Sequence, residues 1–189
     1  MTYEFLGKTV SGPFTIPSGI VTTAPSIIQR IMRDVPAVGV ITTKSIGLEP
    51  RVGNREPIYS QYAPGSFVNA VGLTNPGAHA SLEALSQLNV PDDKFLLVSI
   101  FGGSVEEFVT TAKLLEPVAD GFELNLSCPH ASGYGMAMGQ DPQMVGDIIR
   151  AVKAAVSVPV IPKLTPNVAD IAEIGKAAIA AGADGLCAI

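Results

Sequence analysis

The chain has 189 residues, of which 47% are hydrophobic and 15% are charged. A chain this apolar can bury a core, which argues against intrinsic disorder. Its formal net charge of −5 comes without a basic cluster, which argues against nucleic-acid binding because phosphate neutralisation dominates that affinity.

Short apolar runs alternate along the chain with longer segments of helical period, which is the pattern of repeated strand–helix units. The predicted strands are residues 14–20, 38–43, 95–100, 121–124, 158–163 and 185–189. The predicted helices are residues 25–33, 76–87, 104–116, 142–156 and 168–181. Several strands are apolar almost throughout, as expected for parallel strands that are covered on both faces.

Helix signals support these boundaries. Ser104 and Asp141 are predicted N-caps of the third and fourth helices. The fourth helix shows its apolar face at spacings i, i+3, i+4 and i+7, with Val145, Ile148, Ile149 and Val152. Segment 49–73 departs from the strand–loop–helix spacing and is rich in Gly, Pro and Asn, and loops that long tend to be functional.

Repeated strand–helix units predict an α/β fold with a parallel sheet. An open doubly wound sheet closes within 189 residues, whereas a (β/α)8 barrel takes about 250 residues and eight strands, of which six are predicted here. No G-x-G-x-x-G follows the first strand, so the open sheet lacks its dinucleotide-binding fingerprint. Composition and period leave both architectures open.

The chain shows no sign of export or membrane insertion. No apolar run approaches the roughly 18 residues of a membrane span, and the N-terminal residues lack the basic and apolar stretches of a signal peptide. The two cysteines, Cys128 and Cys187, make no disulfide framework. We therefore expect a soluble, cytoplasmic protein with no membrane partner, no nucleic-acid partner and no metal site.

In either architecture, functional residues gather at the carboxyl ends of the strands. Lys44 and Lys163 each end an apolar strand at that edge. A single lysine there can simply extend to solvent, whereas a pair on one edge favours an anionic ligand or cofactor. Asn125 ends a third strand with an amide that can both donate and accept hydrogen bonds.

Cys128 follows Asn125 on the next loop, where its thiol is expected to face a cleft. It is either an inert small hydrophobe or a reactive thiol whose pKa a nearby cation lowers. The candidate neighbours are Lys44, Lys163 and His130. Cys187 lies within a predicted strand and is expected only to pack, and His79 is expected on a solvated or half-buried helix face.

Six short blocks, in order along the whole chain, carry a family resemblance. They are Pro17-Ser18-Gly19, Thr43-Lys44-Ser45 with Leu48-Glu49-Pro50-Arg51, Asn69-Ala-Val-Gly-Leu, Asn125-Leu-Ser-Cys-Pro, Lys163-Leu-Thr-Pro-Asn167 and Gly182-Ala-Asp-Gly. Together they resemble the dihydroorotate dehydrogenases. Cysteine rather than serine at position 128 is similar to the soluble class of that family.

The resemblance implies an FMN-containing (β/α)8 barrel that oxidises dihydroorotate to orotate in pyrimidine synthesis, with residues 1–189 as the N-terminal part of this single domain. It implies that Cys128 is the base that removes the C5 proton, while FMN N5 takes hydride from C6. The implied substrate-binding residues are Lys44, Asn69, Ala70, Val71, Gly72, Leu73, Asn125 and His130. The implied flavin-lining residues are Ser18, Gly19, Lys44, Ser45, Ser99, Asn125, Lys163 and Ile189.

Two features depart from the family pattern. His130 stands where many members carry Asn, and with Gly139-Gln140-Asp141-Pro142 it is also similar to the pyrimidine-reducing domain of dihydropyrimidine dehydrogenase, which acts on uracil or thymine. The family continues past the position of Ile189 with two further strand–helix units, whose turns bind the FMN phosphate, so we expect this chain to be incomplete for activity. A non-catalytic remnant domain is the remaining alternative.

The resemblance also implies partners. Soluble members pass electrons to fumarate, or to an iron–sulfur flavoprotein subunit and on to NAD. The block from Lys44 to Arg51 is similar to the NAD-linked branch. A homodimer or a heterotetramer is the implied assembly.

Overall fold

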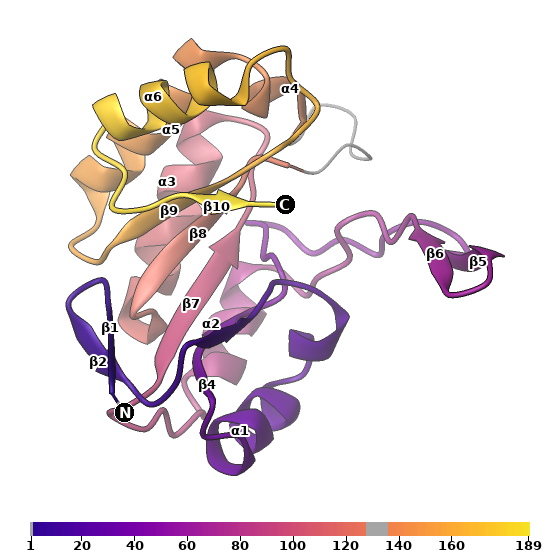
Figure 1. Cartoon of the computed structure of the whole chain (residues 1–189), viewed down its shortest axis with the longest axis vertical. Helices are drawn as coiled ribbons and strands as arrows, with labels where there is room; N and C mark the ends of the chain where they lie inside the picture. Colours follow the sequence, from indigo (N-terminus) through magenta and orange to yellow (C-terminus); the bar gives the residue numbers. More distant parts are fainter. Residues whose placement is uncertain (1, 128–135) are drawn as a thin grey trace.

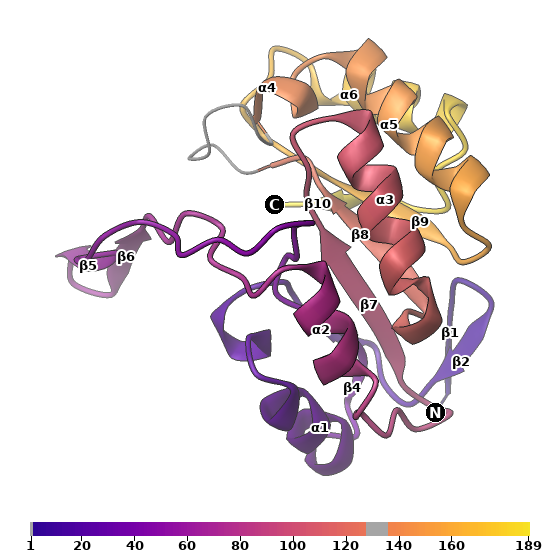
Figure 2. The ribbon, with the colours of Figure 1, turned by 180° about the vertical axis from the view of Figure 1, so that it is seen from behind.

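The computed structural model of the chain describes residues 2–127 and 136–189. Its centre is a six-stranded sheet in the order β10-β9-β8-β7-β4-β3, in which every neighbouring pair is parallel. The strands are β3 (Phe14–Ile16), β4 (Val38–Thr42), β7 (Phe95–Ile100), β8 (Gly121–Asn125), β9 (Val160–Leu164) and β10 (Cys187–Ala188). The main helices gather against one face of this sheet (Figures 1 and 2).

The longer helices of the described residues are α1 (Pro25–Asp34), α2 (Ala78–Leu85), α3 (Val105–Leu115), α5 (Pro142–Ala155) and α6 (Ile171–Ala180). Three short helical segments accompany them, η1 (Ile20–Thr22), η2 (Glu116–Val118) and α4 (Met136–Gly139). Both predicted N-caps are confirmed, since Ser104 Oγ accepts from the third following N–H at 3.2 Å and Asp141 Oδ1 from the second at 2.9 Å. Within the described part of the chain, no helix has the length and apolar character needed to cross a membrane.

The predicted order of strands and helices is confirmed, and all six predicted strands form. The first and last are shorter than predicted, because β3 stops at Ile16 and β10 comprises two residues only. Pro17 follows β3 and has no N–H to continue the ladder, which explains the early end of that strand. Ser18 and Gly19 therefore lie in the loop beyond it. In the described residues β3 and β10 are the edge strands, each with one neighbour, as expected of an unclosed barrel.

The structure contains two antiparallel hairpins that the sequence pattern does not predict. One joins β1 (Tyr3–Phe5) to β2 (Lys8–Val10), through a two-residue turn at Leu6 and Gly7 with positive φ angles of 47° and 83°. The other joins β5 (Tyr59–Ala63) to β6 (Ser66–Asn69) and stands away from the sheet (Figure 1). The strands of the second hairpin are mostly exposed and contain no continuous apolar run, so the sequence pattern predicts a loop over residues 49–73.

The two faces of the sheet bury different apolar layers. The larger layer lies between the sheet and the helices and includes the whole predicted face of α5. The smaller layer lies on the opposite face, where the β1–β2 hairpin packs against the strands. Its buried members are Val10, Val40, Phe95, Leu97 and Ile161.

This second face changes from apolar to polar along the strands. Successive side chains of a strand alternate between faces, so Phe95, Leu97 and Ser99 share one side of β7. The first two belong to the smaller apolar layer, whereas Ser99 is polar and fully buried. The same change along β8 and β9 places Glu123, Asn125 and Lys163 at the carboxyl edge. The fold thereby collects polar side chains at one edge of an apolar layer.

A buried lysine fixes the opposite, amino-terminal edge of the sheet. Lys94 is 2% exposed, and its Nζ donates to Ser11 Oγ at 2.8 Å, the Val35 carbonyl at 3.1 Å and the Val38 carbonyl at 2.7 Å. These three acceptors satisfy the three protons of the ammonium group. Lys94 thus connects the segments that flank α1 and β4.

We predict that Lys94→Met lowers the free energy of unfolding by about 2 kcal/mol, because it leaves buried oxygen acceptors without a donor. Urea unfolding measures the change. Lys113→Met is the matched control, since Lys113 is exposed on α3, and it should change stability by less than about 0.5 kcal/mol. Equal stability of the two variants would contradict a structural role for Lys94.

Candidate active site

A line of hydroxyl groups crosses the carboxyl edge of the sheet from one strand end to the next. Ser18 follows β3, Ser45 follows β4, and Ser99 lies within β7. The Oγ atoms of Ser18 and Ser45 are 3.1 Å apart, and those of Ser45 and Ser99 are 2.9 Å apart. Ser45 and Ser99 are buried, so these hydrogen bonds are shielded from water.

The line ends in a buried ion pair between β8 and β9. Glu123 Oε1 accepts from Ser99 Oγ at 2.8 Å and from Lys163 Nζ at 2.9 Å. The side chains of Glu123 and Lys163 are 2% and 11% exposed. A pair this buried repays the cost of desolvation only when further hydrogen bonds support it, and Ser99 supplies one.

Asn125 joins the same line from the last position of β8. Its Nδ2 donates to Ser45 Oγ at 2.9 Å, and its Oδ1 accepts from the N–H and the hydroxyl of Ser127 at 3.2 and 3.0 Å. The parallel register places Asn125 beside Lys163 and Ser99 beside Glu123. We call Ser18, Ser45, Ser99, Glu123, Asn125 and Lys163 the strand-end network.

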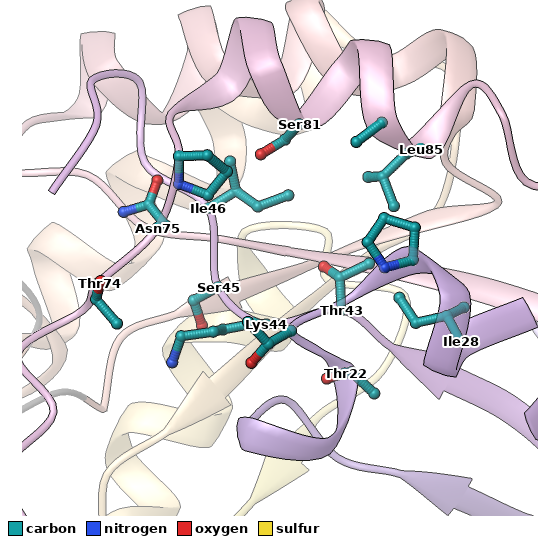
Figure 3. A pocket seen from close by; sticks show the side chains of 14 residues that line it. Thr22, Ile28, Thr43, Lys44, Ser45, Ile46, Thr74, Asn75, Ser81 and Leu85 are labelled. Atoms are coloured by element: carbon teal, nitrogen blue, oxygen red, sulfur yellow. The ribbon is translucent and has the colours of Figure 1, made fainter. Parts of the chain in front are cut away.

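A pocket of about 240 Å³ adjoins the network between α1 and α2 (Figure 3). Lys44 and Ser45 line it where β4 ends, and Ile28 and Leu85 form its apolar part. Both predicted lysines therefore lie at the carboxyl edge, Lys44 at the pocket and Lys163 in the network. Lys163 does not simply extend to solvent, because it pairs with a buried carboxylate.

The predicted substrate segment 69–73 leads from the β5–β6 hairpin to this pocket. Asn69 ends β6 and is exposed, whereas Gly72 and Leu73 are buried and have positive φ angles of 80° and 58°. Asn75 lines the pocket, and its Nδ2 donates to the Leu73 carbonyl at 2.8 Å while its Oδ1 accepts from two backbone N–H groups. This amide holds the segment in its turn.

The remaining predicted residues lie at the margins or outside the described chain. Gly19 lies between β3 and η1, where its carbonyl accepts from Thr22 Oγ1 at 3.3 Å. Ile189 follows β10 and is 67% exposed. Cys128 and His130 lie outside the residues that the structure describes. His79 is exposed on α2, as expected.

Two members of the site were not singled out from the sequence. Glu123 is a charged residue in a strand whose five residues are all buried, and it lies two positions before Asn125. That spacing places both side chains on one face of the strand, which is the signal that could have identified Glu123. Cys187 was expected only to pack. It is half-buried beside Glu123 and Lys163, at the edge of the smaller apolar layer.

The surroundings of Cys187 keep its thiol protonated. Burial, which is the largest cause, and the neighbouring Glu123 carboxylate together raise its pKa from 9.0 to about 11, while Lys163 opposes the shift. Among the described residues, no three His, Cys, Asp or Glu side chains are grouped as metal ligands. The arrangement instead offers amide and ammonium donors for an anionic or carbonyl-rich ligand.

The profile of the dihydroorotate dehydrogenase family matches residues 1–189. The chain belongs to this family. The resemblance seen in the six sequence blocks is therefore confirmed over the whole chain.

Curated relatives carry the name dihydroorotate dehydrogenase B (NAD(+)), catalytic subunit. The protein from Pyrococcus abyssi is 48% identical over 189 residues, which cover 98% of this chain and 60% of the relative. The proteins from Thermococcus kodakarensis and Methanocaldococcus jannaschii are 47% and 44% identical, and their matches cover 100% and 97% of this chain and 61% and 60% of their own lengths. The chain thus spans about 60% of the length of these relatives.

A solved structure has the same fold. The dihydroorotate dehydrogenase of Eimeria tenella, in complex with ferulenol, superposes with a TM-score of 0.78 at 18% sequence identity, covering 98% of this chain and 58% of that one. The six parallel strands and their helices thus correspond to part of the barrel of that protein. Of the two architectures that the sequence left open, the barrel family is confirmed.

We predict that Cys187 reacts about tenfold more slowly with iodoacetamide at pH 8 in the folded protein than in the urea-unfolded chain. A pKa near 11 leaves about 100-fold less thiolate than the ordinary value of 9.0, and the greater nucleophilicity of a more basic thiolate offsets part of that loss. Mass spectrometry of the peptide that contains Cys187 measures the rate. Equal rates in the two states would show that the site does not protect the thiol.

Proposed function

We propose that the protein containing this chain is the catalytic subunit of a dihydroorotate dehydrogenase, which binds FMN and oxidises dihydroorotate to orotate. The observation that carries this proposal is the strand-end network, which aligns hydrogen-bonded polar side chains from five neighbouring strands at the carboxyl edge. Family membership and the names of the relatives support the same activity.

The donors of the network suit a flavin. A flavin ring presents carbonyl oxygens and ring nitrogens along its polar edge, and it gains negative charge when it is reduced. The second N–H of the Asn125 amide and the remaining protons of Lys163 can donate to those acceptors, and the Lys163 ammonium favours the added charge. The residues that would bind the flavin are Ser18, Gly19, Lys44, Ser45, Ser99, Asn125, Lys163 and Ile189.

The substrate would lie at the pocket side of the network. When bound, FMN supplies the two-electron acceptor for the hydrogen that leaves C6 of dihydroorotate. Lys44 provides a cation for the substrate carboxylate, and Asn125 provides a fixed amide. Segment 69–73, ordered by Asn75, supplies backbone groups, and His130 would contribute a further polar contact.

Cys128 would remove the C5 proton. An unperturbed thiol with a pKa of about 8.5 is only a few per cent thiolate at neutral pH, so the base works best when a cation stabilises the thiolate or the pH is alkaline. Lys44 and Lys163 are cations at the same edge of the sheet. We therefore expect activity to rise with pH as Cys128 ionises.

The names of the relatives also bear on partners. They describe the catalytic subunit of an NAD-linked enzyme, which supports a second subunit as the route of electrons to NAD. We propose an iron–sulfur flavoprotein as that second subunit in a heterotetramer, and a cytoplasmic location for the assembly. Dihydroorotate and orotate are the small-molecule partners.

We predict that Cys128→Ser slows reduction of bound FMN by dihydroorotate at least 100-fold at pH 8, because a serine hydroxyl is a far weaker base. Anaerobic stopped-flow absorbance of the complete protein measures the rate. The control is reduction by dithionite, which needs no base and should match wild type. An unchanged rate with dihydroorotate would exclude Cys128 as the base.

Substrate choice is tested on the same protein. Dihydroorotate should reduce the flavin, and dihydrouracil should not. Reduction by dihydrouracil alone would assign the site to a pyrimidine base, as in dihydropyrimidine dehydrogenase. A protein that binds no flavin would contradict the proposed function and favour a non-catalytic domain.

A further inference from the structure

Glu123 is a buried carboxylate for which the proposed reaction has no use. It is 2% exposed, and the other four residues of β8 carry no charge. Removing a carboxylate from water is costly even after the protein relaxes, and an apolar residue would fill such a position without that cost. The contacts of Glu123 show what its charge does.

The ion pair fixes one end of the network. Ser99 and Lys163 both donate to the same oxygen, Glu123 Oε1, at 2.8 and 2.9 Å. The ammonium group therefore has a fixed distance from the carboxylate, and its remaining protons are available to other acceptors. Lys163 is held at the strand end rather than left to move on its four-carbon stem.

The carboxylate also sets the direction of every hydroxyl in the line. A carboxylate only accepts, so Ser99 must donate its one proton to Glu123. With that proton used, Ser99 Oγ can only accept from Ser45, and Ser45 in turn can only accept from Ser18. The three protons thus all point toward Glu123.

This direction and the Ser127 backbone N–H together fix how Asn125 presents its amide. Ser45 Oγ has given its proton to Ser99, so it receives a proton from Asn125 Nδ2 at 2.9 Å. Asn125 Oδ1 then faces the N–H and the hydroxyl of Ser127. In this one arrangement each of the three hydroxyls donates one hydrogen bond, and every bond of the line has one donor and one acceptor. A neutral, apolar residue at position 123 would leave the direction of the hydroxyls undefined.

We infer that Glu123 is a positioning residue of the site. It holds the Lys163 ammonium, and its negative charge limits how strongly that ammonium favours reduced flavin. Through Ser99 and Ser45 it also orients Asn125. The inference rests on the proposed function in that the flavin is the group that Lys163 and Asn125 would contact. Glu123 itself acts through these two side chains.

The test is Glu123→Gln in the complete protein, because glutamine keeps an oxygen that can accept from Ser99 and Lys163 while it removes the charge. Lys163 is then no longer neutralised, so the ratio of affinities for reduced over oxidised FMN should rise about tenfold. For a two-electron couple, that ratio raises the midpoint potential by about 30 mV. Spectroelectrochemical titration of the bound flavin measures it.

Glu116→Gln is the matched control. The Glu116 carboxylate also accepts from a backbone N–H and a hydroxyl, both of Ser157, at 2.6 and 2.7 Å. It lies at the amino-terminal edge of the sheet, before β8, so its variant should keep the wild-type potential. A merely structural effect of losing a hydrogen-bonded carboxylate would appear in unfolding of both variants and not in the potential.

A second measurement needs no flavin. The Glu123 charge contributes to the raised pKa of Cys187, so Glu123→Gln should lower that pKa and speed the reaction of Cys187 with iodoacetamide at pH 8 in the flavin-free protein. An unchanged rate would show that the charge of Glu123 does not affect the ionisation of a neighbouring group in the site, and would overturn the inference.

A second variant keeps the inference testable if Glu123→Gln fails to fold. Ser99→Ala breaks the line of hydroxyls but keeps the Glu123–Lys163 pair, so affinity for FMN in both redox states should fall several-fold with little change in potential. Wild-type affinity in this variant would overturn the orienting role.

The outcomes separate the two proposals. If the wild-type protein binds no FMN, the proposed function fails and this inference fails with it. If it binds FMN and Glu123→Gln keeps the wild-type potential, the inference alone fails.

Discussion

A parallel strand shows alternate side chains to opposite sides of its sheet, and both sides of this sheet are covered. Helices pack on one face, and the β1–β2 hairpin covers the amino-terminal part of the other. A polar side chain on the second face can therefore lie only beyond the apolar layer, at the carboxyl ends. In β7, Leu97 closes that layer and Ser99, two positions later, begins the polar edge. The site is a consequence of this constraint.

Burial also explains why the polar edge is so fully connected. Ser99 and Glu123 have almost no access to water, so each of their polar groups needs a protein partner. The parallel register supplies those partners by aligning Ser99 with Glu123 and Asn125 with Lys163. An ionised carboxylate at one end then leaves a single satisfied arrangement of the hydroxyl protons. Stability of the edge and orientation of the candidate ligand-binding groups have the same physical origin.

Much of this organisation follows from sequence pattern, and some of it does not. Apolar runs and helix caps predict six strands and five helices, and Ser104 and Asp141 cap as expected. The two hairpins escape detection because their strands mix polar and apolar residues and are mostly exposed, so they lack the continuous apolar run that marks the strands of the sheet. Glu123 escapes for a different reason. Its spacing from Asn125 places both side chains on one face of the strand, but the sequence does not show that Ser99 and Lys163 on the neighbouring strands are its partners.

The sequence by itself determined the class of the fold, its family, and the residue types at the strand ends, because these depend on local periodicity and on short motifs. Only the tertiary structure decided which of those residues act together. The two lysines look equivalent in sequence, yet Lys44 lines a pocket between helices whereas Lys163 pairs with a buried carboxylate. Cys187 likewise has a raised pKa because β10 lies beside β9, where burial and the neighbouring Glu123 carboxylate outweigh the opposing charge of Lys163. Pairing between distant strands sets these environments, and no local pattern encodes it.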